Sequence, residues 1–393
     1  MKIVQINIFP NLSTGNIMMD IHRKLLEEGH ESYVVWGRGR KSNNEYEIFM
    51  NDKIGVYYHA LYTRITDKTG FASKRATKKL LQKLEEIKPD IIHLHNIHGY
   101  YINIEELFDY IKNNNIKVIW TLHDCWAFTG HCAYFETVNC NKWKKRCYDC
   151  PQLKTYPISN KDNTEWNYNN KKEIFNNVKN MKLITVSKWL ESKVKESFLS
   201  DYNVETIYNG IKLDVFYPRK SNLRENYNLK DKKIVLGVAS TWSERKGLED
   251  FIKLSEMLSN EYKIVLVGLN KKQLEKTPKN ILAFGRTRTI DELAEFYSIA
   301  DVYFNASIEE TFGLTTVEAM ACGTPVIVYN STALPEVVTK SSGVVVKQKN
   351  IEKVLEVIKL LCESKIFRKE NIIKNAQRFD KNVMIQEYYK LYK

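Results

Sequence analysis

The sequence predicts an α/β protein of two doubly wound domains, and three observations support this prediction. Short apolar runs alternate with amphipathic helical stretches along the whole chain, which is the pattern of βα units on parallel sheets. The alternation forms two successive sets, separated near residues 190–215. The length of 393 residues suits two domains, each large enough to bury its own core.

The first set begins with a strand and a helix that are clear in the pattern. In that helix Ile17, Ile21 and Leu25 recur at i, i+4 and i+8, and Gly29 stands where a C-terminal cap belongs. The predicted strands of the first set are 3–9, 32–36, 90–94, 117–122 and 182–186.

The second set continues the alternation up to a final helix near 380–393. Met384, Tyr388 and Tyr392 lie on one face of that helix, so we expect it to pack against the rest of the protein. The predicted strands are 233–238, 263–267, 281–284, 302–305, 325–329 and 343–346, and the helices between them include 247–258, 290–299 and 315–321.

These two sets define the expected domains. The first should span residues 1–195, the second 205–375, and a last segment 376–393 follows. In doubly wound domains, ligands bind in the crevice outside the carboxyl ends of the strands. We therefore look for functional residues directly after the predicted strands.

Composition and charge exclude several classes of protein. With 43% hydrophobic and 27% charged residues, the chain is neither disordered nor of low complexity. No apolar run approaches the ~18 residues of a membrane-spanning helix, and the N-terminus reads as a strand without a signal-peptide cleavage site. We expect a cytoplasmic protein. The net charge of +13 is spread over both halves, which argues against a nucleic-acid-binding arm.

The most informative segment runs from Glu310 to Ile327, where a glycine turn follows strand 302–305 and leads into a helix. Glu310 lies in the loop, and Glu318 lies one turn into the helix, where it can accept two hydrogen bonds from a ribose diol. A helix start of this kind favours a phosphate, because backbone N–H groups and the helix dipole point at it. The N–H groups offered at this turn belong to Gly313, Leu314 and Thr315.

This segment resembles the Glu-x7-Glu signature of retaining glycosyltransferases of family 4. The resemblance implies the GT-B fold, in which two Rossmann-like domains face each other across a cleft and a C-terminal helix crosses back to the first domain. It extends over nearly the whole chain and includes the element 207–211 at the start of the second domain. The stretches 90–96 and 123–132 look most like the colanic-acid and capsular-polysaccharide branch.

The resemblance implies roles for four catalytic residues. His123, after strand 117–122, resembles the active-site histidine beside the donor sugar, and Arg245 with Lys246 resembles the basic pair that holds the nucleotide diphosphate. Glu310 would then bind sugar hydroxyls. Transfer of a glycosyl group expels a nucleoside diphosphate, so cationic side chains at a helix N-terminus suit this chemistry on physical grounds as well.

The resemblance also implies a set of residues that bind the donor. Gly15 and Asn16 resemble the phosphate-side glycine turn of the first domain, although a tight turn alone would explain a glycine there. Further donor-binding residues are Asn209, the base-lining loop Phe284, Gly285 and Arg286, the sugar-binding Glu310, the turn residues Gly313, Leu314 and Thr315, and the ribose-binding Glu318.

The implied activity is metal-independent transfer of a sugar, with retention, from a nucleotide-diphosphate sugar to a hydroxyl of a glycan. A UDP-sugar is favoured and a GDP-sugar is the alternative donor. The acceptor is expected to be a lipid-linked intermediate of a capsular, exo- or O-antigen polysaccharide. The alternative functions are a nucleotide-sugar epimerase of the same fold and a non-catalytic nucleotide-sugar-binding protein.

Four cysteines gather in a polar insertion at 132–155. Their spacing, with a terminal Cys-x2-Cys pair, is compatible with a tetrahedral structural zinc site. Ordinary reduced thiols and a disulfide are the alternatives, since the spacings are irregular and no second Cys-x2-Cys is present. The four candidate zinc ligands are Cys132, Cys140, Cys147 and Cys150.

Residues 72–86 read as a basic amphipathic helix. Such a helix can attach a protein to the anionic inner face of the plasma membrane, where a lipid-linked acceptor would lie. A helix that packs its apolar face on the protein and exposes its lysines to solvent fits the same pattern. Both interpretations stay open at the level of sequence.

Overall fold

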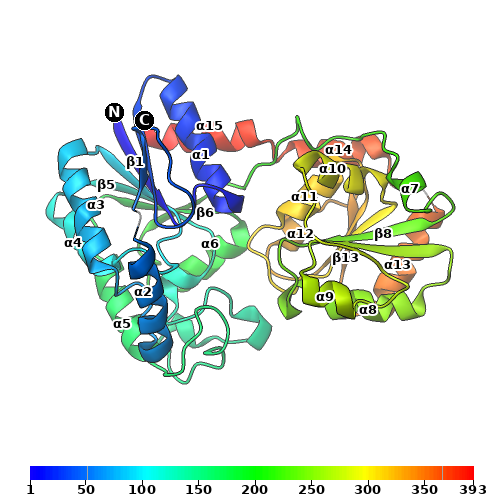
Figure 1. Ribbon diagram of the computed structural model, residues 1–393, viewed down its shortest axis with the longest axis horizontal. Coiled ribbons are helices and arrows are strands. Elements are labelled where there is room, and N and C mark those ends of the chain that lie inside the picture. Colours follow the sequence, from blue (N-terminus) through cyan, green and yellow to red (C-terminus); the bar gives the residue numbers. More distant parts are fainter. Residues whose placement is uncertain (51, 365) are drawn as a thin grey trace. The chain divides into compact units, whose positions relative to one another are not determined.

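The computed structural model describes residues 1–50, 52–364 and 366–393 (Figure 1). The chain divides into two compact units, one of residues 1–207 together with 385–393 and one of residues 208–384. Each unit contains one sheet whose strand pairs are all parallel, flanked by helices. The predicted α/β class with two doubly wound domains is therefore confirmed.

The first unit is built on a seven-stranded sheet in the order β3-β2-β1-β4-β5-β6-β7. The strand order reverses between β1 and β4. In a doubly wound sheet, the crevice that binds ligands forms at this point of reversal. Its strands are β1 (Lys2–Asn7), β2 (Glu31–Trp36), β3 (Glu47–Phe49), β4 (Ile91–Leu94), β5 (Lys117–Leu122), β6 (Met181–Thr185) and β7 (Asn203–Thr206). Its helices are α1 (Leu12–Glu27), α2 (Lys53–Thr66), α3 (Lys74–Ile87), α4 (Ile104–Asn113), α5 (Thr164–Phe175) and α6 (Lys188–Lys195), with 3-10 turns η1 (Trp126–Phe128), η2 (Glu136–Val138) and η3 (Lys142–Lys144).

Two strands of this sheet were not expected from the sequence. Both β3 and β7 are short strands at the sheet edges, and none of their residues is fully buried. Strands of this kind carry no continuous apolar run, so hydrophobic pattern cannot reveal them. Because β7 pairs with β6, the first sheet continues past residue 195.

The second unit has a six-stranded sheet in the order β10-β9-β8-β11-β12-β13. Its core packs α8 and α13 against the sheet through residues such as Phe251, Phe304 and Ile358. The strands are β8 (Lys233–Val238), β9 (Tyr262–Val267), β10 (Leu282–Phe284), β11 (Val302–Asn305), β12 (Val326–Tyr329) and β13 (Gly343–Val346). The helices are α7 (Leu223–Asn226), α8 (Leu248–Met257), α9 (Lys271–Lys276), α10 (Ile290–Ile299), α11 (Leu314–Ala321), α12 (Leu334–Val337), α13 (Ile351–Glu363) and α14 (Lys369–Gln377), with the 3-10 turn η4 (Glu244–Lys246).

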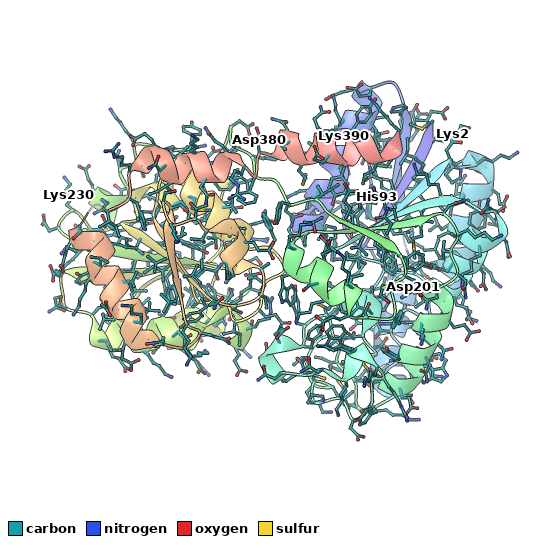
Figure 2. The ribbon with its side chains drawn as sticks, turned by 180° about the vertical axis from the view of Figure 1, so that it is seen from behind. Lys2, His93, Asp201, Lys230, Asp380 and Lys390 are labelled. Carbon is teal, nitrogen blue, oxygen red and sulfur yellow. The ribbon has the colours of Figure 1, made fainter. Side chains whose placement is uncertain are left out.

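The last helix, α15 (Lys381–Tyr392), ends inside the first unit. Tyr388 and Tyr392 are fully buried there. The Tyr392 hydroxyl lies 2.5 Å from Nδ1 of His93, a residue of β4 whose position is marked in Figure 2 together with Lys390 of α15. Thr121 of β5 donates a hydrogen bond to the Tyr388 hydroxyl at 3.3 Å. Buried polar contacts therefore attach the chain end to the middle of the first sheet.

Among the described residues, no helix is both long and apolar enough to cross a membrane.

Candidate functional site

In the second unit, the loops that follow the neighbouring strands β8 and β11 pack backbone against backbone. Gly247, directly after η4, has φ +71°, and a Cβ at this position would lie 2.3 Å from the carbonyl oxygen of Ala306. The N–H of Ile308 donates to the carbonyl oxygen of Arg245 at 2.9 Å. A glycine is required for this approach, and it fixes the predicted basic pair against the loop that carries Glu310.

Arg245, Lys246 and Glu310 form one charged cluster. The Lys246 ammonium donates a hydrogen bond to Glu310 Oε1, and the Arg245 guanidinium lies 4.0 Å from Glu310 Oε2. Ser307 donates a further hydrogen bond to Glu310 Oε1 at 3.1 Å. The structure thus brings together three residues that the sequence analysis singled out in two distant segments.

This cluster controls the charge of its members. Burial by itself raises the pKa of Glu310, but the nearby Lys246 and Arg245 outweigh burial and bring the pKa below its usual value. Burial lowers the pKa of Lys246, and Glu310 opposes that shift. The Glu310 carboxylate therefore stays ionised. Lys246 is its cationic partner, although both side chains are largely buried.

Helix α11 begins beside this cluster. Gly313 precedes the helix with φ +97°, and a Cβ there would lie 2.7 Å from Leu334 Cδ2. The first amide groups of a helix have no intrahelical acceptor, so Leu314 and Thr315 point donors out of the helix start. The N–H of Glu310 donates to Thr332 Oγ1 at 2.8 Å, which fixes the loop in front of them.

Glu318 lies on α11, and its environment differs from that of Glu310. The hydroxyl of Tyr297 on α10 donates a hydrogen bond to Glu318 Oε2 at 2.9 Å. Burial raises the pKa of Glu318 to about 7, because this one hydrogen bond compensates only part of the lost hydration. Sequence analysis missed Tyr297, which looks like an ordinary core residue of its helix.

In the first unit, His123 follows β5 and ends a row of buried polar groups. Its Nε2 lies 3.1 Å from Nδ1 of His95, whose own Nε2 lies 3.4 Å from the Gln5 side-chain oxygen. Burial lowers the pKa of His123 to about 4 and that of His95 well below its usual value. His123 is therefore a neutral imidazole at physiological pH, able to donate from one ring nitrogen and accept at the other.

A second polar pair lies beside His123. His98 Nε2 lies 2.9 Å from Asp124 Oδ2, and His98 Nδ1 lies 2.9 Å from the Tyr156 hydroxyl. Burial alone would raise the pKa of Asp124. The neighbouring His98 lowers the pKa by more than burial raises it, so the net shift is downward. The sequence pattern did not predict this pair.

A small pocket beside it is lined by His95, Asn96, Ile97, His98, Trp120, Leu122, His123, Asp124, Trp126 and Ala127.

The sequence suggested that Gly15 and Asn16 form a turn between the first strand and the first helix. In the structure both residues lie inside α1, near its start. Gly15 is buried, and a Cβ there would lie 2.5 Å from the Phe9 carbonyl oxygen. Asn16 is exposed. The glycine is thus explained by close packing of the helix on the preceding loop.

The element around Asn209 packs against the start of α15. A Cβ at Gly210 would lie 2.5 Å from the Cα of Lys381, and Ile211 pairs with Asp380. Asn209 is buried, and its side-chain oxygen has no hydrogen-bond partner among the described residues.

The expected base-lining loop follows β10. Phe284 packs its ring on Tyr227 and Phe296, with ring centroids 4.8 and 4.9 Å apart. Its carbonyl oxygen accepts hydrogen bonds from Gly268 and Leu269, at the end of β9. Gly285 is partly exposed and Arg286 is exposed.

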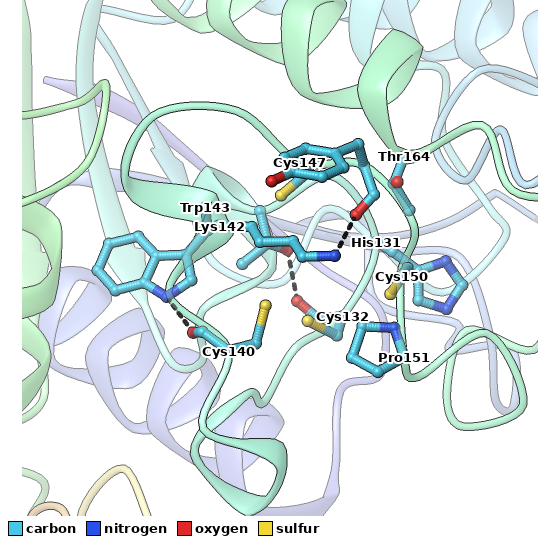
Figure 3. A pocket seen from close by; sticks show the side chains of 11 residues that line it. His131, Cys132, Cys140, Lys142, Trp143, Cys147, Cys150, Pro151 and Thr164 are labelled. Atoms are coloured by element: carbon cyan, nitrogen blue, oxygen red, sulfur yellow. Dashed lines mark hydrogen bonds between the residues drawn. The ribbon is translucent and has the colours of Figure 1, made fainter.

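The four cysteines of the insertion line one pocket (Figure 3). Cys140, Cys147 and Cys150 are free thiols, so no disulfide joins two of the four cysteines and the disulfide alternative is wrong in this structure. In the described part of the chain, no three His, Cys, Asp or Glu side chains are arranged as a ready metal site.

Comparison with known proteins identifies the family of the chain. Residues 14–215 match the family described as Glycosyltransferase Family 4, and residues 219–379 match Glycosyl transferases group 1. The glycosyl transferase WcaC of Escherichia coli K12, which its name assigns to colanic acid biosynthesis, is 24% identical over 416 residues, covering 100% of this chain and 99% of WcaC.

Two further proteins are similar. An α-1,3-N-acetylgalactosaminyltransferase of Campylobacter jejuni, named for N,N'-diacetylbacillosaminyl-diphospho-undecaprenol, is 28% identical over 47% of this chain and 52% of its own. The structure of Anabaena HepE in complex with UDP-glucose has a TM-score of 0.68 at 16% identity, covering 100% of this chain and 99% of HepE. Sheet topology and matched families lead to one conclusion: the chain belongs to glycosyltransferase family 4 and has the GT-B fold.

Proposed function

We propose that this glycosyltransferase moves a hexosyl group, with retention of configuration, from a nucleotide-diphosphate sugar to a hydroxyl of a glycan. A UDP-sugar is the favoured donor, a choice supported by the UDP-glucose bound to the structurally similar HepE. The observation that carries the proposal is the convergence of Arg245 and Lys246 on Glu310 beside the start of α11.

The reaction breaks the bond between the anomeric carbon and the diphosphate, and negative charge develops on the leaving oxygens. Arg245, Lys246 and the first amide groups of α11 are all donors that can stabilise this charge. These protein groups supply the positive charge that a metal ion provides in other phosphate sites, so we assign no catalytic metal to the reaction.

The two acids take different roles. Glu310 is already paired with Lys246 and hydrogen-bonded by Ser307, so it suits a binding role toward sugar hydroxyls better than a nucleophilic one. Retention then follows from same-face attack, with the departing phosphate accepting the proton of the acceptor hydroxyl. Glu318 accepts hydrogen bonds from the ribose diol. Those bonds compensate for hydration that burial takes from the carboxylate.

We assign His123 to the donor sugar. A neutral imidazole at pH 7 hydrogen-bonds a sugar hydroxyl without adding charge to the site, and the row behind it, His95 and Gln5, fixes the ring orientation. Gly15, Asn16, Asn209 and the loop 284–286 remain proposed donor contacts, for which family resemblance is the support.

We further propose a lipid-linked acceptor and attachment to the inner face of the plasma membrane. The name of the Campylobacter relative supports the acceptor, since it specifies an undecaprenol diphosphate. Helix α3 exposes its lysines but buries its apolar face, so its amphipathic pattern is explained by packing. Helix α2 instead exposes large apolar side chains that are 57–85% accessible and recur on one face: Ile54, Tyr57, Tyr58, Leu61 and Ile65.

The assay measures nucleoside diphosphate release from a panel of nucleotide sugars, with and without undecaprenol-diphosphate glycans. We expect acceptor-dependent release, and Lys246→Ala should lower kcat/KM by about 10²–10³-fold. Lys253→Ala on the exposed face of α8 is the matched control and should keep wild-type activity. An epimerised nucleotide sugar as product would instead identify an epimerase, and a glycosyl ester trapped on Glu310 would refute the proposed retaining mechanism.

A further inference from the structure

The insertion at 132–155 has little regular structure to hold it in place. Its only helical elements among the described residues are the 3-10 turns η2 and η3. One side is held by an aromatic cluster, in which Trp143 packs on Phe135 and Phe128 with ring centroids 4.7 and 5.2 Å apart. The segment that carries Cys147 and Cys150 lies outside this cluster and is held by polar contacts, in which Lys142 Nζ donates to the Tyr148 and Asp149 carbonyl oxygens and the Cys150 N–H donates to Asp162 Oδ2.

The four thiols line one pocket. Figure 3 shows the side chains of Cys132, Cys140, Cys147 and Cys150 around the same pocket, although they come from three separate turns of the insertion. Thiolates are preferred ligands of zinc, and four of them satisfy its tetrahedral coordination.

A fifth donor, His131, lines the same pocket and was not expected from the sequence. The ring is 2% exposed, and its Nδ1 is hydrogen-bonded to a carboxylate oxygen of the fully buried Asp67. Its Nε2 is buried and has no hydrogen-bond partner in the described part of the chain. An imidazole with a carboxylate on one nitrogen and nothing on the other is the arrangement that metal-binding histidines use.

Backbone donors already point at two of the thiols. The N–H of Gly130 donates to Cys147 Sγ at 3.2 Å, and the backbone N–H of Gln152 hydrogen-bonds the sulfur of Cys150. Backbone donors of this kind commonly hydrogen-bond the cysteine sulfurs of metal sites, so the surroundings of Cys147 and Cys150 are compatible with ligation.

We propose that this pocket binds one structural zinc ion through Cys140, Cys147 and Cys150, with a fourth ligand from the adjacent residues His131 and Cys132. Binding draws these donors from the pocket wall to the metal, which joins the segment 147–150 to the turns that carry Cys140 and His131. The site is independent of the sugar-transfer chemistry. Its role is to order the insertion that follows the His123 loop.

Elemental analysis of the full chain, purified without a histidine tag and dialysed against metal-free buffer, tests the proposal. We expect about one zinc per chain, and a content below ~0.3 would refute a zinc site. As a readout that needs no variant, Co²⁺ added to chelator-treated protein should give the thiolate-to-cobalt absorption of a tetrahedral site. Absence of that band would refute the ligand set.

Variants identify the ligands. Cys147→Ser and Cys150→Ser should each lose the zinc, whereas Cys362→Ser in α13, a cysteine outside the pocket, should keep it. One of the variants His131→Gln and Cys132→Ser should also lose zinc. If both retain it fully, the proposed fourth ligand is wrong.

Discussion

Glu310 and Glu318 stand eight residues apart, yet their surroundings shift the two pKa values in opposite directions. Two cations neighbour Glu310, whereas the carboxylate of Glu318 accepts a hydrogen bond from the neutral hydroxyl of Tyr297. The spacing of the two acids in the sequence predicted that both are functional. It did not predict which side chains contact them. Lys246 and Tyr297 reach them from other elements, and such non-local contacts depend on the packing of the sheet and its loops.

The raised pKa of Glu318 predicts a pH-dependent stability of the second unit. Burial moves its pKa from 4.5 to about 7, so the folded unit binds the proton more tightly than the unfolded chain. This contribution is complete below pH 4.5 and is lost as the pH rises to about 7. Glu318→Gln should remove that loss, which we expect to be about 1–3 kcal/mol given the partial exposure of the carboxyl.

The measurement is chemical denaturation of wild type and Glu318→Gln between pH 4.5 and 8, followed for the transition of the second unit. The exposed Glu249→Gln on α8 is the control and should follow the wild-type curve. Parallel curves for wild type and Glu318→Gln would show that the carboxyl titrates near its ordinary pKa.

At the scale of single elements, α2 and α3 show what periodicity can and cannot predict. The amphipathic pattern of α3 correctly predicted a helix, and the structure shows Ala76, Thr77, Leu80 and Leu84 packed on the protein. The exposed face of α2 could not be recognised in advance. Apolar residues at i, i+3, i+4 and i+7 usually mark the buried face of a helix, and here the buried residues are His59 and Thr63.

The exposed face of α2 predicts binding to lipid bilayers. The triple variant Ile54→Ser, Tyr57→Ser and Leu61→Ser should weaken co-sedimentation with anionic phospholipid vesicles by at least ~10-fold, because burial of these side chains in the interface is lost. Leu360→Ser, an exposed apolar residue of α13, should bind as wild type does. Undiminished binding of the triple variant would exclude α2 as the membrane contact.

At the scale of the whole molecule, the alternation of strands and helices predicted two doubly wound domains because each βα unit is a local pattern. The pattern also placed Tyr388 and Tyr392 on one face of the last helix. The polar groups that they meet could not be predicted from that pattern, since His93 and Tyr392 are 299 positions apart. Such pairs depend on where the chain end docks.

The contact between Tyr392 and His93 predicts how strongly the chain end stabilises the first unit. Tyr392→Phe leaves the ring in place but removes the hydroxyl, so the buried His93 Nδ1 loses its partner at a cost of about 1–3 kcal/mol. Tyr389→Phe, on the same helix, removes a hydroxyl that hydrogen-bonds the exposed Glu28 carboxylate and lies 3.4 Å from Nε2 of the half-buried His30, groups that water can reach, and we expect almost no change. Denaturation of the first unit measures both variants. Equal stabilities would mean that water satisfies His93 as well as the tyrosine does, and that the end of α15 docks through apolar burial alone.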